Sequence, residues 1–233
     1  MEVGQCNIRS LNTSTKLIED LVKKTQIRML AFTEIWHPDA NKNLLSSWRW
    51  FKNERKEREG GGAAIVLHPS IKSWPRDDLK LEEVESAWCE LSLNNQRILV
   101  CSVYVAPGDE AAMDRWLTQI EQLQHENHSM LLTGDFNAKH PMWYNSGSNK
   151  LGEKLSEFLL TTGSDLLLMN DDSKTYKNSI IDLTISKGCV SAIRNWEVDE
   201  SIFVKTDHHM IRFLIDYEER RQEILRWNTN KAD

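Results

Sequence analysis

Short apolar runs alternate along this chain with longer stretches in which apolar residues recur every three or four positions. The runs are typical of buried strands and the stretches of amphipathic helices, because side chains alternate faces along a strand but repeat about every 3.6 residues along a helix. The predicted strands are residues 3–8, 29–33, 63–67, 87–93, 98–105, 130–133, 166–169, 180–185, 196–198 and 210–215. The predicted helices are residues 15–25, 111–127 and 151–162.

The second and third predicted helices are amphipathic, so each packs one side inward; in the second, Trp116, Ile120 and Leu123 share a face. Helices interspersed among many strands predict an α/β fold, a four-layer sandwich in which two mixed β-sheets pack face to face with helices outside. No repeat or linker divides the chain, so one domain is predicted over residues 1–216. Residues 217–233, charged and then polar, are predicted to form a tail or linker towards a following domain.

The composition is that of an ordinary soluble domain, with 40% apolar and 27% charged residues among 233. The longest apolar run, around residues 97–106, is about half the length that a membrane span needs, so no membrane partner is predicted. The amino end lacks the pattern of a secretory signal, and the four cysteines are spread singly. We therefore expect an intracellular protein with reduced thiols.

The net charge of −6 argues against a protein that coats nucleic acid by bulk attraction, which usually needs a basic surface. It does not exclude a nuclease. A metal-dependent phosphodiesterase concentrates carboxylates in its site and lets the cation supply the local positive charge.

Polar side chains stand at or just past the ends of the predicted inner strands, which is where α/β sheets build sites. Taken singly, each has a structural explanation: a lone Glu is more often a helix cap, and Gly134–Asn137 favours a turn. Their number is more informative, because carboxylates, amides and a histidine buried unpaired would cost several kcal/mol and should converge on one another or on a cation. The residues are Asn7, Glu34, Tyr104, Asp135, Asn137, Asp182, Asp207 and His208.

These positions carry a resemblance to the endonuclease/exonuclease/phosphatase superfamily over about residues 3–216. The segments that carry it are Cys6-Asn7-Ile8, Thr33-Glu34, Val103-Tyr104, Gly134-Asp135-Phe136-Asn137-Ala138-Lys139-His140, Ser179-Ile180-Ile181-Asp182 and Thr206-Asp207-His208. Within the superfamily, the run from Gly134 to Trp143, then Gly152-Glu153-Lys154-Leu155 and Trp196-Glu197-Val198-Asp199, is similar to the apurinic-endonuclease-like domain of non-LTR (LINE-type) retrotransposons.

The resemblance implies a Mg²⁺-dependent DNA endonuclease, with Mn²⁺ as an alternative ion, that nicks one strand of double-stranded DNA. The product would be a 3′-hydroxyl that primes reverse transcription, with a reverse transcriptase fused in the full-length protein and a nuclear location. Glu34 is the first expected metal ligand, because Mg²⁺ prefers oxygen donors, with Asn7 and Asp207 as direct or water-mediated partners.

The resemblance also implies the catalytic roles. His208 would contact the scissile phosphate and be held in its tautomer by Asp182. Asp135 would orient or deprotonate the attacking water, and whether Asp135 or His208 is the base stays open. Two further donors to the phosphate are implied, Asn137 and Tyr104, and three substrate contacts are expected, Lys139, His140 and Ser179.

The chain departs from the repair enzymes of the superfamily. Those enzymes place bulky aromatic residues before the position of Asp182, whereas residues 175–179 hold only Tyr176, so a dedicated repair role is not expected. The DNA-inserting hairpin of the retrotransposon branch is predicted to be very short here, because about four residues separate Thr175 from Ile180. We therefore expect weak sequence preference.

Two further stretches have alternative interpretations. Residues 48–58 interleave aromatic and basic residues, which fits either a nucleic-acid contact or core aromatics followed by a solvated hairpin tip. Gly60-Gly61-Gly62 lacks the ending of a phosphate-binding loop and is predicted to be a turn into the strand at Ala63. For the whole chain, two alternatives to a nuclease stay open: a phosphatase acting on a small phosphoester and a catalytically inactive binding module.

Overall fold

Two six-stranded sheets face each other in the computed structural model, which describes residues 1–36, 44–55, 60–124, 128–161, 165–188, 193–202 and 206–216. The first sheet has the order β11-β12-β1-β2-β4-β3. Its strands are β1 Glu2–Asn7, β2 Ile27–Thr33, β3 Arg49–Asn53, β4 Ala63–Leu67, β11 Ile193–Asp199 and β12 Met210–Ile215. Strands β1 and β2 are parallel and the other pairs are antiparallel, so the sheet is mixed.

The second sheet has the order β5-β6-β7-β8-β10-β9. Its strands are β5 Lys72–Pro75, β6 Glu85–Leu93, β7 Gln96–Tyr104, β8 Ser129–Asp135, β9 Leu166–Leu168 and β10 Asp182–Lys187. Here β7 and β8 are the parallel pair. Each sheet therefore has a pair of parallel strands near its centre, and the carboxyl ends of such a pair emerge at the same edge of the sheet.

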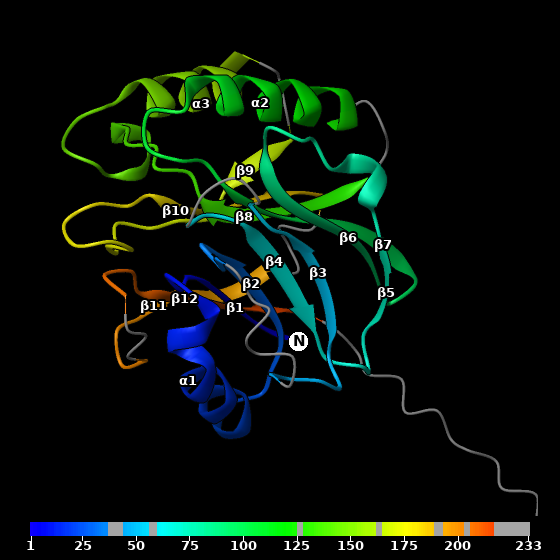
Figure 1. Cartoon of the computed structure of the whole chain (residues 1–233). Helices are drawn as coiled ribbons and strands as arrows, with labels where there is room; N and C mark the ends of the chain where they lie inside the picture. The colour runs from blue at the N-terminus through cyan, green and yellow to red at the C-terminus, as the bar shows by residue number, and fades with distance from the viewer. Residues whose placement is uncertain are drawn as a thin grey trace, which may run out of the picture.

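Helices cover the outer faces of both sheets (Figure 1). Helix α1, Leu11–Lys24, lies against the first sheet, and helices α2, Glu110–Gln124, and α3, Lys150–Thr161, lie together over the second. Two short 3₁₀ helices among the described residues, Asp77–Leu79 and Pro141–Trp143, lie in the connections between β5 and β6 and between β8 and α3. The predicted four-layer sandwich of two mixed sheets with helices outside is confirmed.

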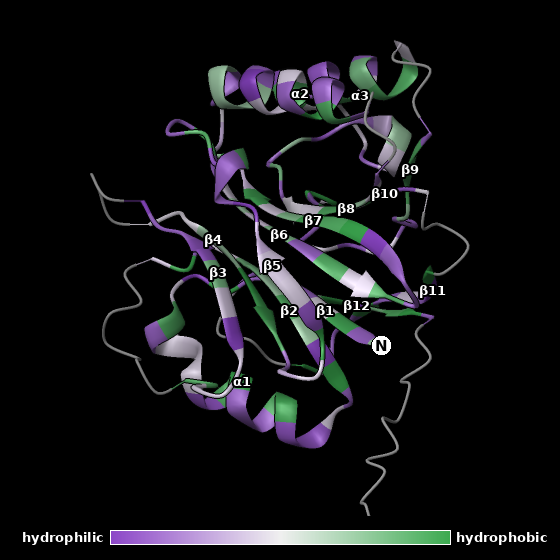
Figure 2. Ribbon diagram, turned by 90° about the vertical axis from the view of Figure 1, so that its right-hand side faces the viewer, coloured by the Kyte–Doolittle hydropathy of each residue, from purple (hydrophilic) through white to green (hydrophobic). Residues whose placement is uncertain are grey.

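Three apolar clusters hold the layers together, and each lies between two of them. The middle cluster joins the inner faces of the sheets, with Met29 and Ile65 from the first and Cys89 and Val100 from the second. The outer clusters lie under α1 and under α2 and α3. Figure 2 shows hydrophobic and hydrophilic residues alternating along the helices, as expected where one side of each helix packs on a sheet. Because both faces of the central strands are buried, these strands read as continuous apolar runs.

Most predicted elements are present, and the differences have physical reasons. Strands β4 and β12 have the predicted bounds, whereas β3 and β5 were not predicted as strands. Both are edge strands with exposed or half-buried residues along much of their length, so neither shows a continuous apolar run. Helix α1 begins at Leu11 rather than residue 15, and β10 begins at Asp182 rather than residue 180.

Trp48 is buried and β3 follows it directly, as expected for core aromatics leading into a hairpin. Residues 56–59, at the predicted hairpin tip, lie outside the described residues, as does the predicted tail 217–233. Among the described cysteines, Cys6, Cys89 and Cys101 are buried free thiols. No helix in the described ranges is long and apolar enough to cross a membrane.

The start of α3 is fixed to the loop after β8 by Asn149. Its Oδ1 accepts hydrogen bonds from the backbone N–H groups of Lys139 and Gly152, both at 2.9 Å. The approach is close enough that a Cβ on Gly152 would lie 1.9 Å from the carbonyl oxygen of Lys139. The position therefore requires glycine for space.

We expect Gly152→Ala to destabilise the protein by about 2–3 kcal/mol, because the added methyl group meets backbone that cannot rotate away. Gly147→Ala is the matched control, since a Cβ there would meet no atom within 4 Å and should change stability by less than about 0.5 kcal/mol. Urea unfolding of both variants and the wild type measures this difference. Equal stability of the two variants would contradict the close approach.

Candidate active site

The polar residues emerge together because of the strand pairing described above. Asn7 ends β1 and Glu34 follows β2, and these strands are parallel neighbours. Tyr104 and Asp135 end the other parallel pair, β7 and β8, and lie opposite each other in register. Asp182 begins the antiparallel strand β10 and pairs with Asp135. Side chains from both sheets therefore meet at one end of the sandwich.

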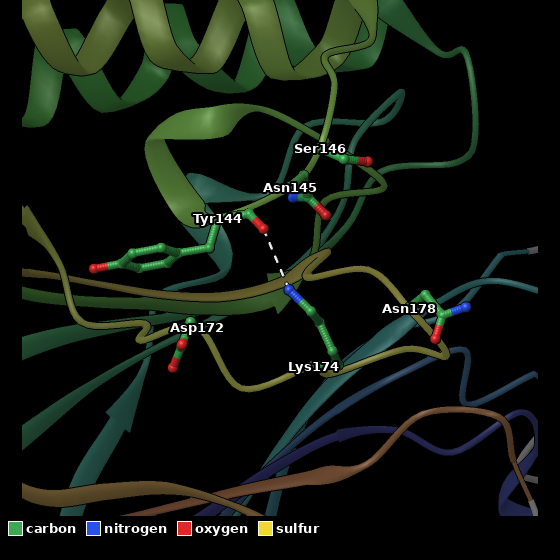
Figure 3. Close-up of a pocket in the computed structure, with 6 residues that line it drawn as sticks. All are labelled: Tyr144, Asn145, Ser146, Asp172, Lys174 and Asn178. Atoms are coloured by element: carbon green, nitrogen blue, oxygen red, sulfur yellow. Dashed lines mark hydrogen bonds between the residues drawn. The ribbon is translucent and has the colours of Figure 1, made fainter.

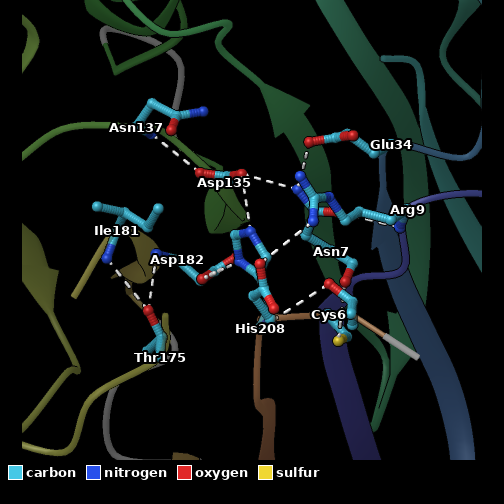
Figure 4. Close-up of polar contacts among 12 residues, drawn as sticks. Cys6, Asn7, Arg9, Glu34, Asp135, Asn137, Thr175, Ile181, Asp182 and His208 are labelled. Atoms are coloured by element: carbon cyan, nitrogen blue, oxygen red, sulfur yellow. Dashed lines mark hydrogen bonds and ion pairs between the residues drawn. The ribbon is translucent and has the colours of Figure 1, made fainter. Parts of the chain in front are cut away.

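Asn7 connects the two sheets at this end. Its Nδ2 donates to Oε1 of Glu34 at 2.9 Å, within the first sheet, and to Oδ2 of Asp135 at 2.8 Å, across to the second (Figure 4). Its Oδ1 accepts from the backbone N–H of Arg9 at 3.1 Å. Asn7 is fully buried, and these contacts use both ends of its amide. One side chain thus sets the position of two carboxylates that are 101 residues apart in sequence.

Asp182 and His208 form a buried pair beside this amide. Oδ2 of Asp182 lies 2.8 Å from Nδ1 of His208, and Nε2 on the other side of the ring lies 3.9 Å from Oδ2 of Asp135. The ring of Tyr176 packs against the imidazole at 4.5 Å between centroids. His208 is therefore oriented with Nδ1 towards Asp182 and Nε2 towards Asp135 (Figure 4).

Burial and mutual charge shift the titration of this group. Burial raises the pKa of Asp135, and the charge of Asp182 raises it further, to about 7, against the opposing effect of His208. Burial alone would lower the pKa of His208, but the carboxylates of Asp182 and Asp135 favour its charged form and raise the pKa to about 9. At neutral pH the histidine is therefore an imidazolium.

Tyr104 and Asn137 flank the carboxylates. Tyr104 is buried, and desolvation followed by the charges of Glu34 and Asp135 raises the pKa of its hydroxyl, so it stays a neutral donor. The side chain of Asn137 donates to the carbonyl of Val105 at 3.0 Å, and its backbone N–H donates to Asp135 Oδ1 at 3.0 Å.

Two residues of this group have left-handed backbone conformations. Asn137 has φ 47° and Glu34 has φ 50°, a region that costs roughly 1–2 kcal/mol for a residue with a side chain. Strain of this kind tends to collect at functional sites, where the surrounding structure holds it in place.

The other predicted residues lie around this group rather than in it. Asp207 is exposed and forms ion pairs with Arg9 at 3.3 Å and Lys177 at 3.4 Å, so its charge is already met by two cations. The structure thus brings together Glu34 and Asn7 of the predicted metal ligands, and gives Asp207 different contacts.

The three predicted substrate contacts have different surroundings. Lys139 is exposed. His140 caps the 3₁₀ helix Pro141–Trp143, with its Nδ1 accepting from the N–H of Met142, and packs on Trp143. Ser179 pairs with Tyr176 across a tight turn, as the short spacing predicts.

Three residues that support the site were not predicted from the sequence. Thr175 accepts hydrogen bonds at Oγ1 from the N–H groups of Ile181 and Asp182, which fixes the start of β10. The indole of Trp36 donates to Oε2 of Glu34 at 3.3 Å. Arg9 forms an ion pair with Asp207. Trp36 and Arg9 could have been found from their positions in the sequence, because each lies two residues after a predicted site residue.

The donor set fits a hard divalent cation. One ligand atom from each of Asp135, Asp182 and His208 lies within 4.8 Å of the others, a grouping that could hold a metal. Oδ1 of Asp182 is buried without a hydrogen-bond partner among the described residues, and Glu34 adds a third carboxylate next to Asn7. Because the raised pKa of His208, about 9, keeps both ring nitrogens protonated at neutral pH, the carboxylate oxygens are the available donors, which suits a hard divalent ion such as Mg²⁺ or Mn²⁺.

A hollow of about 560 Å³ opens beside the loops that carry these residues. It is lined by Tyr144, Asn145, Ser146, Asp172, Lys174 and Asn178 (Figure 3). Lys174 Nζ donates to the carbonyl of Tyr144 at 3.2 Å, while the ring of Tyr144 is 56% exposed. Asn145 bonds both backbone groups of Ile180, two residues before Asp182, so the hollow adjoins the site.

Comparison with known proteins agrees with this geometry. The profile of the endonuclease–reverse transcriptase family matches residues 98–212. The resemblance to the retrotransposon endonucleases is confirmed. The solved endonuclease domain of TRAS1, a telomere-specific non-LTR retrotransposon, is 19% identical, with a TM-score of 0.78 over 93% of this chain and 99% of that one. The AP endonuclease LMAP from Leishmania major is 12% identical, with a TM-score of 0.76 over 93% of this chain and 88% of that one.

A curated relative from Drosophila melanogaster, a probable RNA-directed DNA polymerase from transposon BS, is 18% identical over 218 residues. The match covers 86% of this chain but 24% of that protein. The chain spans about a quarter or less of the length of the curated relatives it matches. The chain therefore shares the fold of these endonucleases.

In the presence of chelator, we expect the free energy of unfolding of the domain to fall by about 1–3 kcal/mol between pH 6.5 and pH 9. The folded pKa of His208, about 9, exceeds its ordinary value of 6.5, so this stabilisation is complete below pH 6.5 and is lost as pH rises. The raised pKa of Asp135 adds a similar decline between pH 3.8 and about 7.

Urea unfolding at a series of pH values measures this profile, with His208→Asn as the comparison. The variant should be flatter above pH 7. A wild-type profile equally flat above pH 7 would contradict the charged Asp182–His208 pair.

Proposed function

We propose that this chain is a Mg²⁺-dependent DNA endonuclease that nicks one strand of a duplex and leaves a 3′-hydroxyl, which primes reverse transcription in retrotransposon integration. One observation carries the proposal: the Asn7 amide joins Glu34 to Asp135 across the two sheets, and Nε2 of His208, which is paired with Asp182, lies 3.9 Å from the same Asp135 oxygen. A carboxylate for a hard cation, a second carboxylate for water and a charged donor for phosphate are thereby placed within one small volume.

The contacts support distinct roles for the two central residues. His208, charged at neutral pH and held through Nδ1, donates from Nε2 to an oxygen of the scissile phosphate. An imidazolium has no free lone pair, so it is a poor base. Asp135, with a pKa near neutrality, orients and deprotonates the attacking water. The geometry therefore favours Asp135 as the general base.

Glu34, supported by Asn7, is the proposed metal ligand. When bound, Mg²⁺ supplies positive charge for the phosphate oxygens and for the departing 3′-oxygen. The hydroxyl of Tyr104, kept neutral by its raised pKa, and the amide of Asn137 add donors towards the same phosphate. The cation and these two neutral donors together stabilise the negative charge on the phosphate oxygens.

The surroundings support a DNA substrate. Arg9 and Lys177 form a cationic rim around Asp207, and the exposed Lys139 lies in the loop after β8, although the whole chain is acidic. Phosphate contacts of this kind position a duplex without reading its sequence. The tight turn at Tyr176–Ser179 offers little that could enter a groove, which supports weak sequence preference.

The biological setting is part of the proposal. The curated relatives are RNA-directed DNA polymerases much longer than this chain, which supports a reverse transcriptase fused to the domain in the full-length protein. A chromosomal DNA target requires a nuclear location.

We expect His208→Ala and Asp135→Ala to reduce nicking of supercoiled plasmid by at least about a thousandfold at saturating Mg²⁺, because each removes a group that acts only in the transition state. Conversion to open circles measures the rate, and thermal unfolding checks that the variants are folded. His209→Ala, the neighbouring histidine, is the matched control and should keep wild-type activity. Full activity in either site variant, or nicking that persists in chelator, would refute the assignment.

The hollow beside the site is expected to hold a nucleotide flanking the cleaved bond, through stacking on Tyr144 and attraction to Lys174. Tyr144→Ala with Lys174→Ala should raise KM for duplex DNA about tenfold and leave kcat within about twofold, because stacking contributes about 1–3 kcal/mol per base. Lys80→Ala, which removes a half-buried, ion-paired lysine next to the 3₁₀ helix Asp77–Leu79, is the control. An unchanged KM would show that DNA bypasses this surface.

A further inference from the structure

The Gly60-Gly61-Gly62 turn encloses a buried ion pair. All three glycines have positive φ, between 72° and 88°, in the loop that enters β4. A Cβ on Gly61 would lie 2.1 Å from Oε2 of Glu85 and 2.6 Å from Cζ of Arg55. The turn therefore needs glycine at this position because Arg55 and Glu85 occupy the space that a side chain would fill.

The Arg55–Glu85 pair joins the two sheets. Arg55 lies just after β3 of the first sheet, and Glu85 begins β6 of the second. Nε of Arg55 lies 2.7 Å from Oε1 of Glu85, and the other carboxylate oxygen accepts the N–H of Gly62. Both side chains are mostly shielded from solvent, at 14% and 22% exposure. One carboxylate thus holds both the arginine and the glycine turn.

Two short routes connect this pair to the candidate active site. In the first, the carbonyl of Gly61 accepts the backbone N–H of Trp36 at 3.0 Å, and the Trp36 indole donates to Glu34. In the second, the Arg55 guanidinium lies 5.8 Å from the centre of the Tyr104 ring, and Glu85 faces Tyr104 in the β6–β7 register. The ion pair therefore lies next to the groups that hold Glu34 and Tyr104 in place.

We propose that Glu85 and Arg55 are positioning residues that act through the glycine turn to fix Glu34, and through the arginine to fix Tyr104. The inference rests on the proposed function for the meaning of Glu34 as a metal ligand, but its structural part stands separately. An ion pair shielded from solvent is a weak source of stability, because desolvation of the charges offsets their attraction. Its placement between the Glu34 support and Tyr104 gives it a specific role in holding the site.

The test compares Glu85→Gln with Glu90→Gln. Glu90 lies on the same strand, with its side chain 10% exposed against 22% for Glu85, and pairs with Arg97 at 2.9 Å, but contacts none of the residues linked to Glu34. Hydrogen exchange of the metal-free proteins should show the Trp36 backbone N–H exchanging about tenfold faster in Glu85→Gln and unchanged in Glu90→Gln. A merely structural pair would affect stability in both variants without this local difference.

The second readout concerns the metal. Glu85→Gln should raise the Mn²⁺ concentration for half-maximal plasmid nicking about tenfold, while affinity for duplex DNA in chelator stays within twofold. Wild-type Trp36 exchange together with wild-type metal dependence in Glu85→Gln would overturn the proposal. Faster Trp36 exchange in a chain that never nicks DNA would sustain the positioning role and refute the proposed function.

A variant that retains the charge covers the case in which Glu85→Gln does not fold. Arg55→Lys keeps the charge but loses the planar contact of Nε with Glu85. In Arg55→Lys, the Trp36 backbone N–H should exchange at a rate between those expected for the wild type and for Glu85→Gln. Its thermal stability should be close to that of the wild type. Wild-type exchange in Arg55→Lys, with Glu85→Gln unfolded, would count against the proposal.

Discussion

The hydrogen bonds of one buried amide decide how the two sheets present their carboxylates. Asn7 has a single NH₂ group, and it gives one hydrogen to each sheet. Any sliding of one sheet over the other would break one of these bonds inside the protein, where a lost partner costs about 1–3 kcal/mol. The apolar middle layer supplies most of the attraction between the sheets, but apolar contacts are not directional. The register between Glu34 and Asp135 is therefore fixed by directional bonds between the sheets, of which the Asn7 amide is the one that contacts both carboxylates; Gln5 and Ser102 provide others.

The second constraint is the accumulation of negative charge at one point. Three carboxylates converge here, those of Glu34, Asp135 and Asp182. Among the described residues of the group, His208 is the one buried cation. Burial and the charge of Asp182 raise the pKa of Asp135, and the neighbouring carboxylates keep His208 charged. A group of this kind is poised to accept further positive charge, because each added cation relieves repulsion that folding has imposed. The same electrostatics would favour a metal ion bound among these carboxylates.

The sequence was most informative where a residue's position could be inferred from a strand end. Apolar runs located β4 and β12 at their full bounds, and parallel pairing then explains why Asn7 and Glu34, or Tyr104 and Asp135, share an edge. The assignment of roles to Asp135, Asp182 and His208 came from resemblance, since spacing alone does not say that residues 182 and 208 are bonded. Edge strands β3 and β5 escaped detection because one of their sides faces solvent. Pairs such as Arg55 with Glu85 could not be predicted, because charged residues after a strand look the same whether they meet a partner or water.

The tight turn at residues 177 and 178 has a consequence for adaptation. Both residues are exposed, and the core clusters draw nothing from them. Yet the turn begins one residue after Tyr176, which touches His208. Extra residues inserted there would extend outward without disturbing the interior, and would emerge beside His208. A short loop anchored at such a point is a place where lengthening one connection would add contacts next to the candidate active site while leaving the core unchanged.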